Sequence, residues 1–265
     1  MLRQRTLTAV IGLPIFIVVI WFGNPWFTIF MAIIAVLGSI EFNRMANHNK
    51  IQPIAYFGTA IIFILTISPY YPDFITKPLI LTAAILISLI WLLFSYKKEG
   101  SFNNWALIMA GILYLGWTLS YWTELRDIEY GKEWVFWGIL TIMASDTSAF
   151  FIGKKWGKHY MTPAISPKKT WEGAIGGLLG SIIASIILGI IFSLPLNYWL
   201  LVLLGCVISI FAQLGDLVES LLKRNSGVKD SGNLVPGHGG ILDRIDSFIL
   251  AGIIIYYCVI FIGTI

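Results

Sequence analysis

Long, continuous apolar stretches alternate with short polar stretches along the whole chain. A stretch of about 20 apolar residues is long enough to cross the hydrocarbon core of a bilayer as a helix. The apolar positions do not repeat with a period of two, which argues against the strands of a membrane barrel. We therefore predict an all-α fold, a polytopic bundle of membrane helices. The nine predicted transmembrane segments are residues 7–22, 25–44, 54–69, 77–96, 104–123, 134–152, 172–193, 197–222 and 247–264.

The composition supports a membrane protein, since 57% of the 265 residues are hydrophobic and only 12% are charged. The net charge of +4 does not indicate a nucleic-acid partner, because in a membrane protein the location of Lys and Arg matters more than their sum. Cys206 and Cys258 lie within apolar segments without the spacing of a metal site, so we predict packing roles for both.

Lys and Arg are distributed unevenly between the predicted loops. With a cytoplasmic N-terminus, only Lys77, Arg126 and Lys132 of the 18 fall outside, which leaves fifteen on the cytoplasmic side. Cytoplasmic loops carry such an excess, so we predict this orientation in the cell inner membrane. Two long cytoplasmic loops follow, 153–171 and 223–246. We expect a scaffold of membrane helices over residues 1–133 and a catalytic membrane region with both loops over residues 134–265.

Three carboxylates interrupt the apolar segments of the second half. Asp146 lies in the sixth segment, and Asp216 and Glu219 lie on one face of the eighth. A charge within the bilayer is costly, so such residues usually face a polar cavity or a partner. Lys223 follows Glu219 by four residues and offers a structural ion pair. Asp216 has no cation within a turn, so we predict a site role for it.

The loop 153–171 ends in ISPKKTWEG, just before the seventh segment. Thr170 is placed to cap that helix, and Glu172 falls in its first turn, where a carboxylate favours the helix dipole. Lys168 and Lys169 before a helix N-terminus suggest a cradle for an anion. The earlier lysines of this loop are equally consistent with attraction to anionic lipid headgroups.

The seventh segment also carries glycines at four-residue spacing, which lets helix backbones approach closely. Two interpretations are open for these glycines: packing within the bundle and the seam of a homodimer.

The stretch 220–246 is rich in ionisable groups, with eight in 27 residues: Lys223, Arg224, Lys229, Asp230, His238, Asp243, Arg244 and Asp246. Asp243 and Asp246 are three residues apart, so in a helix they point the same way and favour a divalent metal between them. The Lys and Arg residues around them suit phosphate groups. This set indicates phosphoryl or nucleotidyl transfer. His238 is open to three roles: a base, a phosphate donor or a turn residue.

The order of residues in this stretch resembles the signature of the phosphatidate cytidylyltransferases, also called CDP-diacylglycerol synthases. The shared positions are Ser220, Leu222, Lys223, Arg224, Lys229, Asp230, Gly232, Pro236, His238, Gly239, Gly240, Asp243, Arg244 and Asp246. The runs SDTSAFFIGKKWGK and SPKKTWEG are similar to the same family, so the resemblance covers about residues 140–250.

The resemblance implies transfer of CMP from CTP to phosphatidic acid with Mg²⁺, alone or beside a second cation. Asp216, Asp243 and Asp246 are then the expected metal ligands, and Asp243, Asp246, Lys223 and Arg244 the expected catalytic residues. The expected substrate-binding residues are Lys168, Lys169, Arg224, Lys229, His238, Ser220 and Asp146.

Two other functions stay open. A CTP-dependent kinase of polyprenol or phytol type would release CDP in place of pyrophosphate. A transporter of anionic lipid would use the same basic loops without turning over CTP.

Overall fold

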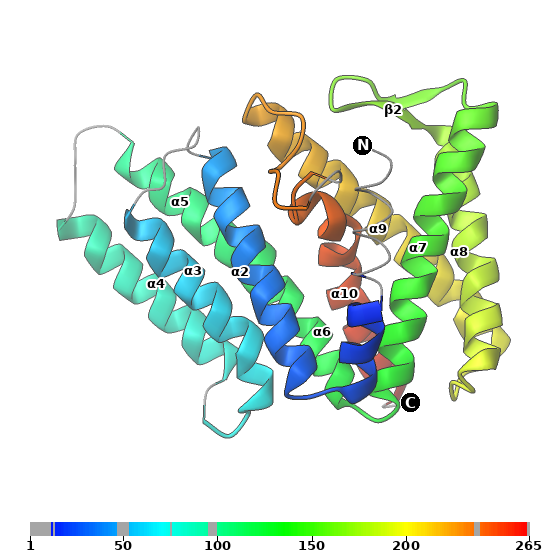
Figure 1. The fold of residues 1–265 in the computed structure, drawn as a ribbon, viewed down its shortest axis with the longest axis horizontal. Helices are drawn as coiled ribbons and strands as arrows, with labels where there is room; N and C mark the ends of the chain where they lie inside the picture. The colour runs from blue at the N-terminus through cyan, green and yellow to red at the C-terminus, as the bar shows by residue number, and fades with distance from the viewer. Residues whose placement is uncertain are drawn as a thin grey trace. The chain divides into compact units, whose positions relative to one another are not determined.

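The structure is a computed structural model, and it describes residues 12, 14–46, 53–74, 76–94, 100–235 and 239–263. Most of these residues are helical (Figure 1). Seven helices of the described part are long and apolar enough to cross a membrane. They are α2 (Trp26–Ala46), α4 (Lys77–Phe94), the continuous helix Ser101–Asp127, α7 (Gly131–Trp156), α8 (Trp171–Ile191), α9 (Tyr198–Asn225) and α10 (Leu242–Gly263).

The predicted helical membrane bundle is confirmed, and the count of nine segments stays a prediction. The predicted segment 54–69 is the shorter helix α3 (Pro53–Ile67), followed by the 3₁₀ turn η1 (Ser68–Tyr70). Of the predicted segment 7–22, residues 14–22 are helical, and much of the remainder lies outside the described residues. The helix Ser101–Asp127 consists of α5 (Ser101–Gly111), a π-helical stretch η2 (Ile112–Trp117) and α6 (Thr118–Asp127).

The chain folds into two compact units. The first unit comprises Met1–Glu124 and Asp230–Asp243, and the second comprises Leu125–Lys229 and Arg244–Ile265. The predicted division at residue 133 concerns function and stays a prediction. The boundary between the units falls within the first turn of α10, since Asp243 belongs to the first unit and Asp246 to the second.

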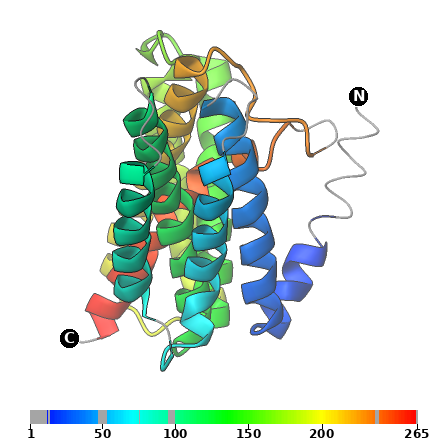
Figure 2. The ribbon, with the colours of Figure 1, turned by 90° about the vertical axis from the view of Figure 1, so that its left-hand side faces the viewer.

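In the first unit, α3 packs between α2 and α4, and α5 with η2 packs against α3 (Figures 1 and 2). A small residue favours these contacts: a Cβ at Gly116 would lie 3.0 Å from the Ile62 Cα, so glycine lets η2 approach the α3 backbone closely. Ser39 of α2 and Thr59 of α3 hydrogen-bond at 2.8 Å. This unit also buries an ion pair between Lys77 and Glu124.

In the second unit, α8 packs against both α7 and α9, which also contact each other. Added Cβ atoms at Gly176 and Gly180 would lie within 2.5 Å of Ile152 and Ser148 of α7. The glycines of the predicted seventh segment are therefore used in packing within the chain, and a homodimer stays a prediction.

The contact between α8 and α9 is polar as well as tight. Ser181 and Ser185 of α8 donate hydrogen bonds to the carbonyl oxygens of Gly205 and Leu201 at 2.7 and 2.6 Å. In an apolar solvent such interhelical bonds satisfy hydroxyl groups that have no water to bind.

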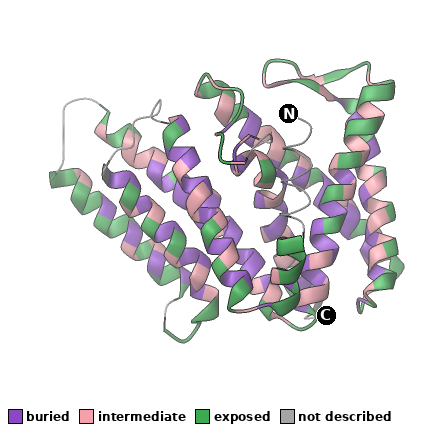
Figure 3. Ribbon diagram, viewed as in Figure 1, coloured by how far each residue is buried: buried purple, intermediate pink, exposed green. Residues whose placement is uncertain are grey.

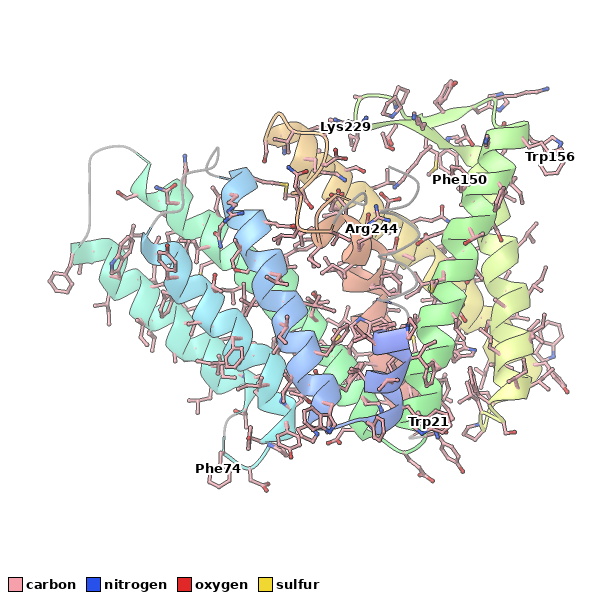
Figure 4. The ribbon with its side chains drawn as sticks, in the orientation of Figure 1. Trp21, Phe74, Phe150, Trp156, Lys229 and Arg244 are labelled. Carbon is pink, nitrogen blue, oxygen red and sulfur yellow. The ribbon has the colours of Figure 1, made fainter. Side chains whose placement is uncertain are left out.

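Large apolar side chains stay exposed on many helices (Figure 3). Phe94 and Trp199 are more than 80% exposed, and Phe150 and Trp156 project from the end of α7 (Figure 4). In a soluble domain such a surface would promote aggregation, whereas lipid accommodates it.

The predicted loop 153–171 is shorter and more ordered than we expected. Because α7 continues to Trp156, the non-helical part begins at Gly157 and forms an antiparallel hairpin of β1 (Tyr160–Thr162) and β2 (Ser166–Thr170). Lys168 and Lys169 thus lie on a strand. The predicted cap is confirmed, since the Gly173 amide donates to Thr170 Oγ1 at 3.2 Å. Glu172 lies in the first turn of α8 and contacts His159 Nδ1 at 2.6 Å.

Candidate active site

Four carboxylates of the second unit come from three helices and interact with one another. Asp246 of α10 interacts electrostatically with Asp216 and Glu219 of α9 and with Asp146 of α7. These are the predicted intramembrane acids together with one acid of the predicted loop. Their convergence shows that the polar residues of separate apolar segments form one cluster.

Two lysines offset part of this negative charge. Lys169 Nζ lies 2.8 Å from Asp216 Oδ2, and Lys223 pairs with the fully buried Glu219 one turn away. The predicted pair of Glu219 and Lys223 is confirmed. Asp216 obtains its cation from β2, which is 47 positions away in the sequence, so spacing along α9 gave no sign of this ion pair.

Hydroxyl groups and a close helix contact order the same cluster. The Ser247 side chain hydrogen-bonds to Asp146, and Ser220 Oγ makes a long contact of 3.5 Å to Asp216 Oδ1. A Cβ at Gly215 would lie 2.5 Å from the Asp246 carbonyl oxygen. Gly215 therefore lets α9 approach the start of α10, a role that the sequence analysis missed.

The basic residues of the predicted site differ in how they are held. Arg224 Nε donates to the Ile165 carbonyl at 3.1 Å, so this side chain ties the end of α9 to the hairpin turn. Lys168, Lys229 and Arg244 are exposed (the last two are labelled in Figure 4). Exposed cations of this kind are suited to bind an anionic substrate.

Asp243 has a different environment, in the first unit. Its Oδ2 accepts hydrogen bonds from the Ser231 and Gly240 amides, both at 2.9 Å, and lies 3.0 Å from the Ser231 hydroxyl, whose single proton it shares with Glu41. Asp243 thus organises the segment before α10. Gly239 adopts a φ of +87°, and a Cβ there would lie 2.8 Å from Asp243 Oδ2. His238 lies outside the described residues.

Glu41 of α2 is the main residue that sequence reasoning missed. Its side chain is buried and accepts hydrogen bonds from Ser231 and Leu242. One acid within the second apolar segment was the available signal, because a lone carboxylate in such a segment needs a partner.

The comparisons with known proteins match almost the whole chain. The model of the cytidylyltransferase family matches residues 3–262. The chain belongs to this family. Proteins named phosphatidate cytidylyltransferase are similar to it over nearly their full length. The one from Bacillus subtilis (strain 168) is 34% identical over 97% of both chains, and the one from Staphylococcus haemolyticus (strain JCSC1435) is 36% identical over 93% of this chain and 95% of its own.

The resemblance that the signature indicated is thereby confirmed. As a cytidylyltransferase, the protein is a membrane-embedded nucleotidyltransferase. The match extends through the N-terminal helices, where the sequence showed only apolar character.

Proposed function

We propose that this cytidylyltransferase transfers CMP from CTP to phosphatidic acid and so forms CDP-diacylglycerol and pyrophosphate. The observation that carries the proposal is the near full-length similarity to proteins named phosphatidate cytidylyltransferase. The clustered carboxylates with adjacent cations support it, because nucleotidyl transfer requires groups that bind and neutralise phosphates.

In this reaction a phosphate oxygen of the lipid attacks the α-phosphorus of CTP. A new oxygen–phosphorus bond forms, the bond between the α-phosphorus and the bridging oxygen breaks, and pyrophosphate leaves. The attacking phosphate is already ionised at neutral pH, so the protein does not need a strong base. Its main tasks are to align the two substrates and to stabilise the charge of the leaving group.

We assign the cationic side chains to these tasks. Lys223, Arg224, Lys229 and Arg244 offset charge on the leaving pyrophosphate or on the lipid phosphate, and Lys168 and Lys169 hold one of the two anionic substrates. We assign Ser220 and Asp146 to substrate binding as well, and the same role for His238 stays a prediction from the sequence. The position of Lys169 beside Asp216 supports its assignment, since this ammonium already lies at the carboxylate cluster.

The carboxylates are the residues that would hold Mg²⁺, alone or with a second cation. Asp216 and Asp246 lie in one electrostatic cluster, and Asp243 precedes Asp246 by one turn of α10. Within the described part of the chain, no three Asp, Glu, His or Cys side chains form a ready cation cage. This fits Mg²⁺, which is usually bound by one or two carboxylates together with substrate phosphates and water. When bound, the ion would neutralise charge on the triphosphate.

We propose that this chemistry takes place at the cytoplasmic face of the inner membrane. The excess of Lys and Arg in the predicted cytoplasmic loops supports this side, and CTP is a cytoplasmic nucleotide.

Purified protein in detergent, given CTP and phosphatidic acid, tests the proposal. We expect pyrophosphate and CDP-lipid in equal amounts, and neither product when phosphatidic acid or Mg²⁺ is omitted. Release of CDP with phosphorylation of a supplied lipid alcohol would instead show a kinase. If folded protein turns over neither substrate pair, the proposal is wrong and lipid transport becomes the function to test.

A further inference from the structure

Glu41 is a buried acid in the apolar helix α2, and the proposed chemistry does not use it. Its residue is 1% exposed. A buried carboxylate is costly unless hydrogen-bond donors surround it, so its contacts show what it stabilises.

Those contacts lie at both ends of the segment 231–242. Glu41 Oε2 accepts a hydrogen bond from the Ser231 hydroxyl at 3.1 Å and another from the Leu242 amide at 3.0 Å. The first bond is at the start of the segment, and the second is at the first residue of α10. One side chain of α2 therefore holds Ser231 and Leu242, which are 11 positions apart in the chain, close to each other.

Two glycines allow the segment to approach Glu41 this closely. A Cβ at Gly232 would lie 2.5 Å from Glu41 Oε1, and a Cβ at Gly240 would lie 2.4 Å from Oε2. Any larger residue at either position would displace the backbone or the carboxylate. The close approach of the segment to the Glu41 carboxylate therefore depends on glycine at positions 232 and 240.

Ser231 links Glu41 to Asp243. Its hydroxyl lies 3.1 Å from Glu41 Oε2 and 3.0 Å from Asp243 Oδ2, and its amide donates to the same Asp243 oxygen. Leu242, whose amide binds Glu41, is the residue before Asp243 in the chain. Glu41 thus restrains Asp243 by two routes: through the Ser231 side chain and through the backbone of Leu242.

We propose that Glu41 is a positioning residue, which sets the placement of Asp243 by holding both ends of the segment 231–242 against α2. The expected effect of Glu41 on kinetics rests on the proposed function, whereas its role in holding the segment 231–242 does not. Removal of the carboxylate would leave the buried Leu242 amide without its acceptor and the Ser231 hydroxyl with Asp243 alone, and would loosen the segment.

Limited trypsin digestion in detergent tests the mechanical role without reference to activity. The reporter is cleavage after the exposed Lys229, next to the segment, and the internal reference is cleavage after the exposed Lys168 on the hairpin. In Glu41→Ala we expect cleavage at Lys229 to be about tenfold faster, with cleavage at Lys168 unchanged. Glu41→Gln keeps one carbonyl acceptor, so its rate of cleavage at Lys229 should lie between those of Glu41→Ala and the wild type.

Ser39→Ala is the matched control for general damage to α2. Ser39 is also fully buried, but its hydroxyl bonds to Thr59 of α3. The Ser39→Ala variant should be cleaved at Lys229 within about twofold of the wild-type rate. If Glu41→Ala does not fold, Ser231→Ala removes one of the two contacts and should give a smaller increase in the same cleavage.

Kinetics separate positioning from loss of folded protein. A smaller folded fraction lowers the apparent kcat only, whereas a displaced Asp243 should also raise the Mg²⁺ concentration that gives half-maximal activity. For Glu41→Ala we expect kcat to fall about tenfold or more and this Mg²⁺ concentration to rise about threefold or more, with Glu41→Gln partly rescuing both.

Equal cleavage at Lys229 in Glu41→Ala and Ser39→Ala, together with an unchanged Mg²⁺ dependence, would overturn the inference. If the wild-type protein does not turn over CTP and phosphatidic acid, the proposed function fails instead. The trypsin comparison would still decide whether Glu41 holds the segment.

Discussion

At the scale of single residues, Asp243 combines two tasks that substitution can separate. Its Oδ2 accepts hydrogen bonds from two backbone amides and shares the Ser231 hydroxyl with Glu41, and its charge is proposed to bind the metal. The carbonyl oxygen of an asparagine can accept the same hydrogen bonds but carries no charge. Asp243→Asn should therefore retain the wild-type melting temperature and show no detectable CDP-lipid synthesis.

Asp243→Ala is the comparison for this prediction, because alanine removes both tasks. It should lose activity and also become sensitive to trypsin at Lys229. Full activity in Asp243→Asn would show that the carboxylate has only the structural task.

At the scale of elements, the first unit depends on an ion pair between α4 and α6. Lys77 Nζ lies 2.9 Å from Glu124 Oε1 and 3.3 Å from the centre of the Tyr121 ring, while Lys77 is only 8% exposed and Glu124 24%. The ammonium is thus held by a carboxylate and by the face of an aromatic ring. Because α6 follows the π-helical stretch η2, the positions of these groups depend on that irregular turn.

We predict that Glu124→Gln destabilises the protein by about 2–3 kcal/mol, because it leaves the buried Lys77 charge uncompensated. The cost stays below that of a fully buried pair, since Glu124 keeps some exposure to solvent. Thermal unfolding in detergent measures the effect as a lower apparent Tm.

The matched control is Lys132→Gln. Lys132 and Glu133 form a more exposed pair at 3.3 Å, and such pairs contribute about 0–1 kcal/mol. An apparent Tm that falls equally in both variants, or in neither, would contradict the importance of the buried pair.

At the scale of the whole molecule, the distribution of charged residues predicts the orientation in the membrane. The excess of Lys and Arg predicts that Lys168 and Lys229 lie in the cytoplasm and that Lys132 lies outside. Single cysteines at these three positions, with Cys206 and Cys258 replaced by serine, test this arrangement. In intact spheroplasts a membrane-impermeant maleimide should label only the cysteine at 132, and in inverted vesicles only those at 168 and 229.

The opposite pattern of labelling would reverse the orientation and move the proposed site to the other face. Labelling of 168 and 229 from different sides would show that the predicted number of crossings between them is wrong. Maleimide treatment after detergent solubilisation is the control, because all three cysteines should then react.

The sequence was most informative where chemistry and local spacing coincide. The residues of the stretch 220–246 identified the family, and the spacing of Glu219 and Lys223 predicted an ion pair that the structure contains. Thr170 and Glu172 likewise marked the start of α8 correctly. These features depend on neighbours within one helical turn, and local geometry is already encoded in residue order.

The sequence was less informative about contacts between distant segments. The pairing of Lys169 with Asp216 and the hold of Glu41 on Ser231 join positions 47 and 190 residues apart. The hairpin of Tyr160–Thr170 was missed because its strands are only three and five residues long, too short for a periodic pattern.

By itself, then, the sequence determined that the chain forms membrane helices, which family it resembles and which residue types carry its chemistry. These follow from continuous apolar runs, from the cost of charge in lipid and from an ordered set of polar residues. Only the tertiary structure decided which acids share a cluster, which lysine neutralises Asp216 and which buried carboxylate restrains Asp243. Partners of this kind are chosen by the packing of helices, and packing brings together residues whose order in the chain does not reveal that they meet.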